Sequence, residues 1–294
     1  MSRMRVIAVT ALAVLALASP GSAADPTWPK TMTFTIMATE SPAEVTRRWG
    51  PLLARLEADL GVPVLPVVAD FRGIVGVWKS GTAELGHLMP KAYVEASANQ
   101  VDVEPIAQFQ HANGALGFRA CLITHSDSDI FTPEDMAGRT FAFNDPGSTS
   151  GYLVPAVFFT TEMGIEPDKH FAKVLFTGSH EASIHAVATK QVEVASTNLV
   201  DLQQAMLKDK ALRGSLRVIW VSKLIPNDPI VVRKDLPASL RQAVQRSLLT
   251  MRARHPEAFK ALGPGVGGFA RADAATYEVV RQLAAAAKKI SPRR

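Results

Sequence analysis

Short apolar runs alternate with longer amphipathic segments along most of the chain. The run 33–38 alternates apolar and polar side chains, as a half-buried strand does. The segment 41–61 begins with Ser41 and Glu44 in the spacing of a capping box and ends at Gly61, which is typical of a helix. Its apolar positions form one helical stripe, made of Val45, Trp49, Leu52, Leu53, Leu56 and Leu60. The pattern therefore predicts a strand followed by an amphipathic helix.

The same alternation continues as far as residue 222. Further strands are predicted at 64–69, 83–89, 120–125, 139–143, 173–177, 192–196 and 217–222, with helices or helical turns at 70–81, 90–98, 132–138, after 151, at 180–191 and up to 206. This rhythm predicts an α/β fold with largely parallel sheets. The glycine-rich segment 263–269 lacks the pattern and is predicted to be a loop.

Polar residues gather where the predicted strands end. In α/β sheets the binding crevice lies beyond the carboxyl ends of the strands, where loops lead into helix N-termini. The candidate loops are 39–41, 70–71, 88–90, 144–150, 178–180, 197–198 and 226–228. Trp49, Trp78 and Trp220 lie instead on apolar helix or strand positions, and we interpret them as core residues.

The first 24 residues have the features of a secretory signal peptide. Arg3 and Arg5 precede an apolar run, 6–18, and small residues follow up to Ala24. The mature protein is therefore expected to be exported, most simply to a bacterial periplasm. Removing the two arginines lowers the formal net charge from +5 to +3. That charge is spread without a basic block, which argues against nucleic acid as a partner.

The usual signatures of catalysis and metal binding are missing from the sequence. Cys121 is the single cysteine and lies in an apolar run, so we expect an inert buried thiol. His180 and His185 are five residues apart, whereas two zinc ligands on one helical face are four apart. The serines near residue 150 fit neither a nucleophile elbow nor a nucleotide-binding loop. No cofactor is predicted.

Three consecutive hydroxyl side chains, Ser148, Thr149 and Ser150, follow the turn "NDPG" at a strand-to-helix junction. A helix start needs only one side-chain oxygen as its N-cap. The helix N-terminus offers free N–H groups and a partial positive charge, to which the other hydroxyls would add neutral donors. The segment is therefore either an ordinary cap or a site for a tetrahedral, oxygen-rich anion, and the motif alone leaves both open.

Three longer segments resemble the signature regions of the phosphonate, phosphite and phosphate solute-binding proteins of ABC transporters. They are "FAFNDPGSTSGYLVP", "FTGSHEASIHAVATKQVEVASTN" and "VIWVSKLIPNDPIVVRKDLP", with weaker matches at "PLLARLEADLG" and "VADFRGIVGVWKSG". The resemblance implies a two-lobed periplasmic binding protein of type II, with two mixed, mostly parallel sheets joined by a hinge. It further implies one lobe from 25–119 and 224–294, another from 120–223, and permease and ATPase subunits as partners of a monomer.

The resemblance also implies a binding site for a small phosphorus oxyanion between the lobes. Ser148, Thr149 and Ser150 would hold its oxygens, and His180 would contribute another donor. Asp228 would accept the proton of a P–OH group, which sulfate does not offer. As an alternative, Asp228 is a turn-forming residue before Pro229.

This sequence departs from the family pattern at three positions around the expected ligand. Aminoalkylphosphonate-binding members carry tyrosines where this chain has Phe71 and Leu88, and a glutamate where it has Val200, two residues after Asn198. A buried ammonium group would lose a partner there, which is costly. We therefore predict a small or apolar substituent on phosphorus, as in phosphite or methylphosphonate, in preference to 2-aminoethylphosphonate.

The main functional hypothesis is a transport receptor that binds an anion, closes around it and delivers it to a permease. A binding protein that serves a sensor would use the same cleft. A secreted hydrolase of phosphorus compounds is a third possibility, but it would need a nucleophile with a base or a cluster of metal ligands.

Overall fold

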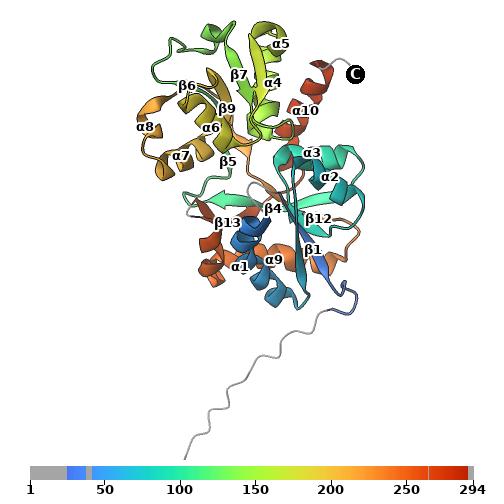
Figure 1. Cartoon of the computed structure of the whole chain (residues 1–294). Helices are drawn as coiled ribbons and strands as arrows, with labels where there is room; N and C mark the ends of the chain where they lie inside the picture. The colour runs from blue at the N-terminus through green and yellow to red at the C-terminus, as the bar shows by residue number, and fades with distance from the viewer. Residues whose placement is uncertain (1–24, 38–41, 264, 291–294) are drawn as a thin grey trace, which may run out of the picture.

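The computed structural model describes residues 25–37, 42–263 and 265–290 and has two lobes, each built around its own sheet (Figure 1). The predicted signal peptide and the Ser41 cap lie outside the described residues. Helix α1 (Pro42–Leu60) buries the six residues of the predicted apolar stripe. Gly61 follows it with a φ of 66°, a conformation that favours glycine at a helix end.

The first sheet has six strands in the order β13-β4-β12-β3-β1-β2. Its strands are β1 (Met32–Met37), β2 (Val64–Ala69), β3 (Leu85–His87), β4 (Val103–His111), β12 (Pro229–Arg233) and β13 (Val266–Arg271). The helices of this part of the chain are α1, α2 (Phe71–Lys79), α3 (Pro90–Ala98) and α9 (Ala238–Arg254), with a 3₁₀ segment, Pro256–Leu262. One apolar core cluster joins α1, α9 and the strands between them.

The second sheet has five strands in the order β10-β6-β9-β7-β8. They are β6 (Ala120–His125), β7 (Thr140–Phe143), β8 (Lys173–Phe176), β9 (Val194–Asn198) and β10 (Leu216–Val221). Helical segments connect them: Pro133–Met136, Thr149–Leu153, α4 (Val154–Val157), Phe158–Glu162, α5 (Pro167–His170), α6 (His180–Ala188), α7 (Leu199–Lys208) and α8 (Leu212–Ser215). A phenylalanine cluster around Phe141 packs under this sheet.

Two chain crossings join the sheets. The short strands β5 (Gly117–Phe118) and β11 (Ile225–Pro226) pair antiparallel there. A side chain at Gly117 would place its Cβ 2.5 Å from the Ile225 carbonyl oxygen, so only glycine permits this close approach. The C-terminal helix α10 (Glu278–Ile290) packs against both α3 and α4. The two crossings thus lie side by side, as a hinge requires.

The sheets are mixed, but parallel pairs do not predominate as the sequence suggested. In the first sheet β1 pairs parallel with β2 and β3, while the other three neighbour pairs are antiparallel. In the second sheet two of the four pairs are parallel. In the first sheet β12 returns from the second lobe and inserts antiparallel between β3 and β4, and β13 pairs antiparallel with β4. In the second sheet β6 runs antiparallel to both of its neighbours, β9 and β10.

The prediction of a loop at 263–269 is wrong from Val266 onward, because strand β13 begins there and pairs antiparallel with β4. The register shifts between Val266 and Gly268, which marks a bulge. A Cβ at Gly267 would lie 2.3 Å from the His111 carbonyl oxygen. These glycines therefore allow the strand to approach β4 closely.

The Cys121 thiol should be inert in the folded protein. It is fully buried in the second sheet, and burial raises its pKa to about 12. Because the thiolate is the reactive form, we expect no reaction with a disulfide reagent such as DTNB in the native state and one equivalent after unfolding in urea. Rapid labelling of the native protein, followed by absorbance, would contradict this.

Candidate functional site

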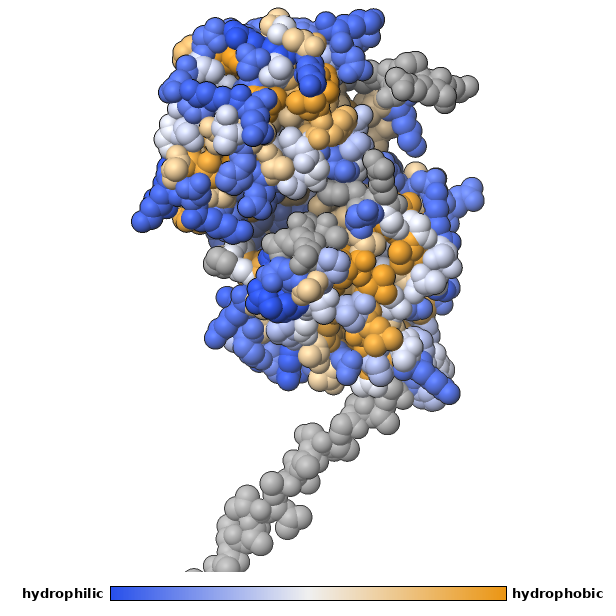
Figure 2. Space-filling view, in the orientation of Figure 1, coloured by the Kyte–Doolittle hydropathy of each residue, from blue (hydrophilic) through white to orange (hydrophobic). Residues whose placement is uncertain are grey.

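A cavity of about 790 Å³ lies between the lobes. The space-filling view shows the surface hollowed between the upper and lower lobes (Figure 2). Seven of the predicted site residues line the cavity: Ser148, Thr149, Ser150, His180, Asn198, Val200 and Asp228. They come from four separate segments of the chain, and the ends of strands and the starts of helices bring them together.

The three hydroxyls keep their hydrogens available to the cavity. Ser148 is the N-cap of the helical segment that begins at Thr149, and its Oγ accepts from Gly151 N at 3.0 Å. Thr149 Oγ1 accepts from Lys91 N at 3.0 Å, and Ser150 Oγ accepts from Asn198 Nδ2 at 3.4 Å. None of these hydroxyls donates to another described residue, so capping occupies only an acceptor position. The cap and a role in anion binding are therefore compatible.

Thr149 also links the two lobes. Helix α3 has no side-chain cap of its own at Met89. The hydroxyl of Thr149 accepts the N–H of Lys91 in the first turn of α3 instead, across the cavity wall. Two helix N-termini therefore meet at one side of the cavity, and both present a partial positive charge to it.

His180 lies at the start of α6, behind its N-cap Ser179. Its Nδ1 lies 3.1 Å from Thr197 Oγ1, and its Nε2 lies 3.4 Å from Asn198 Nδ2. Burial lowers the pKa of His180 below its ordinary value, while the carboxylates of Asp201 and Asp228 oppose that shift. The ring is therefore neutral at neutral pH and acts by hydrogen bonding, not by charge.

The lowered pKa of His180 predicts a loss of stability in acid. At a pH between the ordinary histidine pKa of 6.5 and the lower pKa of His180 in the folded protein, the unfolded chain binds a proton that the folded protein does not. The contribution to the free energy of unfolding is thus complete above pH 6.5 and is lost as the pH falls through the folded pKa. Urea unfolding between about pH 7.5 and pH 5 should show a smaller acid loss in His180→Asn than in the wild type. Equal pH dependence would contradict the assignment.

Helix α7 places one more carboxylate in the cavity wall. Asn198 is the N-cap of α7, and its Oδ1 accepts from Asp201 N at 2.9 Å. Its Nδ2 donates to Asp201 Oδ2 at 2.6 Å. Val200 lines the cavity as expected, but so does Asp201 beside it. The absence of an acidic residue at Val200 therefore does not leave this wall without a carboxylate.

His87 is a cavity residue that sequence reasoning missed. Its Nε2 lies 2.8 Å from Asp228 Oδ2, and its ring packs between Trp49 and Phe109. Trp49 is buried in the core, as predicted, but it lines the cavity as well. The signal in the sequence was a histidine inside the apolar run "ELGHLM".

Of the two remaining predicted positions, the structure describes the side chain of Leu88. Leu88 is fully buried in an apolar cluster with Tyr93 and does not line the cavity, whereas its neighbours His87 and Met89 do. The structural reason is the alternation of side chains along an extended chain, which turns Leu88 to the other face. The side chain of Phe71 lies outside the described part of the structure.

Asn144 also lines the cavity; the sequence placed it in the candidate loop 144–150 but did not single it out as a ligand-binding residue. It directly follows β7, is fully buried, and neither polar atom of its side chain has a partner among the described residues. A Cβ at Gly151 would lie 2.3 Å from the Asn144 Cβ, so Gly151 is what lets this amide lie against the Ser148 turn. An amide in this position can serve as both donor and acceptor.

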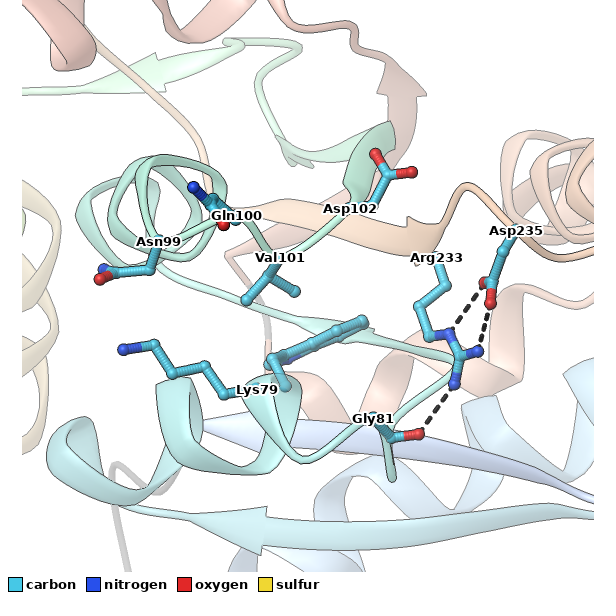
Figure 3. Close-up of a pocket in the computed structure, with 9 residues that line it drawn as sticks. Lys79, Gly81, Asn99, Gln100, Val101, Asp102, Arg233 and Asp235 are labelled. Atoms are coloured by element: carbon cyan, nitrogen blue, oxygen red, sulfur yellow. Dashed lines mark hydrogen bonds and ion pairs between the residues drawn. The ribbon is translucent and has the colours of Figure 1, made fainter.

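A smaller cavity of about 260 Å³ lies beside α2 and α3 (Figure 3). Arg233 crosses it, donating to the Gly81 carbonyl oxygen at 2.8 Å and forming an ion pair with Asp235. The opposite charges of Arg233 and Asp235 thus compensate each other in this smaller cavity. In the described ranges, no group of three or more His, Cys, Asp or Glu residues is arranged to hold a metal ion. The same ranges contain no helix long and apolar enough to span a bilayer.

The sequence profile of one family matches residues 34–277, which is most of the chain. Its description is the periplasmic substrate-binding protein of phosphonate ABC transporters. The chain belongs to this family. Among known members, it is 33% identical over 223 residues to the phosphonates-binding periplasmic protein of Escherichia coli, covering 73% of this chain and 64% of that protein, just under two thirds of its length.

Two further members differ in what their names say they transport. The phosphate-import protein PhnD of Mycolicibacterium smegmatis is 30% identical over 235 residues, covering 74% of this chain and 73% of that protein. The crystal structure of a binding-protein component of an ABC phosphonate transporter from Pseudomonas aeruginosa is 30% identical, with a TM-score of 0.77 and coverage of 88% and 87%. The family is therefore shown, together with the two-lobed fold of type II periplasmic binding proteins.

Proposed function

We propose that this family member binds a small phosphorus oxyanion, namely a phosphonate, phosphite or phosphate, in the cavity between its lobes. The observation that carries the proposal is the set of three hydroxyls at Ser148, Thr149 and Ser150, whose hydrogens have no acceptor among the described residues. Neutral donors at a helix N-terminus bind an oxyanion without a fixed positive charge. His180 and the Asn144 amide add further hydrogen-bonding groups nearby.

Asp228 gives the site its selectivity among oxyanions. Its carboxylate lines the cavity, and Oδ1 has no hydrogen bond to another described residue. A P–OH group can donate to it, whereas a sulfate ion would place an oxygen lone pair against a carboxylate oxygen. Phosphorus oxyanions that carry a proton are therefore favoured over sulfate.

The substituent on phosphorus is small or apolar. Val200, Met89 and the rings of Trp49 and Phe109 line the cavity, and these side chains favour a small or apolar group over an ammonium group. The carboxylates of Glu181 and Asp209 also line the cavity, as does that of Asp201, which accepts a hydrogen bond from Asn198. Leu88 no longer supports this preference, since it does not reach the cavity.

The protein acts as a receptor without chemistry of its own. Its lobes comprise 25–119 with 224–294, and 120–223, a division that the strand membership of the two sheets supports. It works in the periplasm as a monomer and delivers its ligand to the permease and ATPase subunits of an ABC importer. This assignment rests on membership of the family.

Calorimetric titration with phosphite, methylphosphonate, phosphate, 2-aminoethylphosphonate and sulfate tests the proposal. We expect binding of at least one phosphorus compound, no binding of sulfate, and tighter binding of phosphite or methylphosphonate than of the amino compound. Turnover assays with phosphate and phosphonate esters should show no product. Tightest binding of 2-aminoethylphosphonate would overturn the proposed substituent, and binding of sulfate alone would overturn the proposed ligand class.

A further inference from the structure

His87 makes a contact that the roles given above do not use. Its Nε2 lies 2.8 Å from Asp228 Oδ2, and the His87 side chain is 9% exposed. Asp228 Oδ1, in contrast, has no hydrogen bond to another described residue. The two oxygens of the Asp228 carboxylate thus have different surroundings: Oδ2 is bound by His87, whereas Oδ1 is available to a ligand.

The His87 ring is held in this orientation by its neighbours. The Trp49 ring centroid lies 5.1 Å away and the Phe109 centroid 5.4 Å away, at interplanar angles of 39° and 81°. The His87 Nδ1 is buried and has no partner among the described residues. The contact with Asp228 is therefore made by Nε2 alone, whose N–H donates to the carboxylate.

Other titratable groups around Asp228 do not take over this role. His180 faces it from α6, and burial lowers the pKa of His180 so that the ring is neutral at neutral pH. Tyr277 also lies near it, but burial raises the pKa of Tyr277, and its hydroxyl donates to the Asn227 carbonyl oxygen at 2.8 Å. Arg47 and Arg48 line the same cavity from α1, where Arg48 donates to the Leu262 carbonyl oxygen. His87 is the residue whose side chain donates directly to the carboxylate.

Resting on the proposed function, we propose that His87 is a positioning residue that sets the specificity of the site: it holds the Asp228 carboxylate in place by a hydrogen bond to Oδ2, with Oδ1 turned toward the ligand. Without this donor, nothing among the described side chains fixes the orientation of the Asp228 carboxylate. A carboxylate that can turn away no longer places an oxygen lone pair against an oxyanion that lacks a proton, so it would reject such an oxyanion less strongly. Removal of His87 should therefore relax the discrimination between P–OH ligands and sulfur oxyanions.

Methylphosphonate and methanesulfonate form a matched pair of probes, because both are tetrahedral and carry a methyl group but only the first has an acidic O–H near neutral pH. The dissociation constants of both are measured by calorimetry on the mature chain. In His87→Phe, which keeps the ring packing and loses the donor, the ratio of the two constants should shrink by at least about tenfold, with a gain for methanesulfonate. His87→Gln keeps an N–H donor at similar reach and should preserve most of the ratio.

Two further variants distinguish a loss of positioning of Asp228 from a general loss of structure or binding. His125→Gln alters a histidine at the end of β6 that does not line the cavity and should leave the ratio unchanged. Asp228→Asn should itself lose the discrimination, and adding His87→Phe should change the ratio no further, because the two residues act as one unit. If His87→Phe does not fold, His87→Leu takes its place with the same criteria.

Each outcome decides between the proposals. Three results would overturn the role of His87 while leaving the proposed function intact. The first is a wild-type ratio of dissociation constants in His87→Phe, and the second is a loss of that ratio in His87→Gln as large as in His87→Phe. The third is a further change of the ratio when His87→Phe is added to Asp228→Asn. If the wild type binds neither methylphosphonate nor any other phosphorus oxyanion, the proposed function fails and this inference fails with it.

Discussion

Replacing both Ser148 and Thr149 by alanine is expected to abolish measurable binding of the best phosphorus oxyanion. Each hydroxyl has a free hydrogen at the cavity. A hydrogen bond to a charged group contributes about 1.5–3 kcal/mol, so the double variant should bind at least about 100-fold more weakly, and each single variant should lose part of this affinity. Calorimetric titration measures the effect.

Thr149→Ser is the matched control, since it keeps the hydroxyl and the bond to Lys91 N while removing only a methyl group. It should retain most of the affinity. The stability of Ser148→Ala must be measured alongside, because loss of an N-cap costs about 0.5–2 kcal/mol. If the folded double variant still binds with nearly wild-type affinity, the hydroxyls are caps and nothing more.

The second large effect is expected at Gly86, where β3 passes β1. Gly86 pairs with Thr35, and a Cβ on it would lie 2.0 Å from Thr35 Oγ1 and 2.6 Å from the Thr35 carbonyl oxygen. Because backbone atoms are involved, the two strands would have to separate. Gly86→Ala should lower the free energy of unfolding by about 3 kcal/mol or more, and it should weaken ligand binding through the adjacent His87.

Urea unfolding followed by circular dichroism measures this loss. Gly50→Ala is the control, because a Cβ at Gly50 in α1 meets no atom within 4 Å. Alanine in place of glycine inside a helix should stabilise by about 0.5–1 kcal/mol. Equal stability of Gly86→Ala and the wild type would show that the strands can accommodate the methyl group.

Local features of the fold could be predicted well from the sequence. All six apolar residues of the α1 stripe are buried, because helical periodicity depends only on nearby positions. Strand β4 was not predicted: its sequence "VEPIAQFQH" carries Pro105 and two glutamines. It is a strand because β12 and β13, from distant parts of the chain, pair on its two sides. Such pairing leaves no local pattern.

In the candidate site, too, the sequence did not fix which of two neighbouring residues faces the cavity. Recognition of the family segments placed Ser148, Thr149, Ser150, His180 and Asp228 in the cavity wall, although their contact with a ligand stays a prediction. At β3 the expected residue was Leu88, but His87 faces the cavity. A strand of three residues is too short for its pattern of polar and apolar residues to show which side chains face the cavity. A shift of one residue moves every side chain to the opposite face of the sheet.

The position of β12 between β3 and β4 has a consequence for the order of folding. The strands of the second sheet all come from one continuous stretch, 120–221. The first sheet is complete only when β12, which follows that stretch in the chain, has paired with β3 and β4. Closing so long a loop is slow. We therefore expect amide hydrogens of β6 and β9 to become protected from exchange before those of β3 and β4 during refolding. The capacity to capture a solute would then arise only in the final step, so that partly folded molecules do not sequester it.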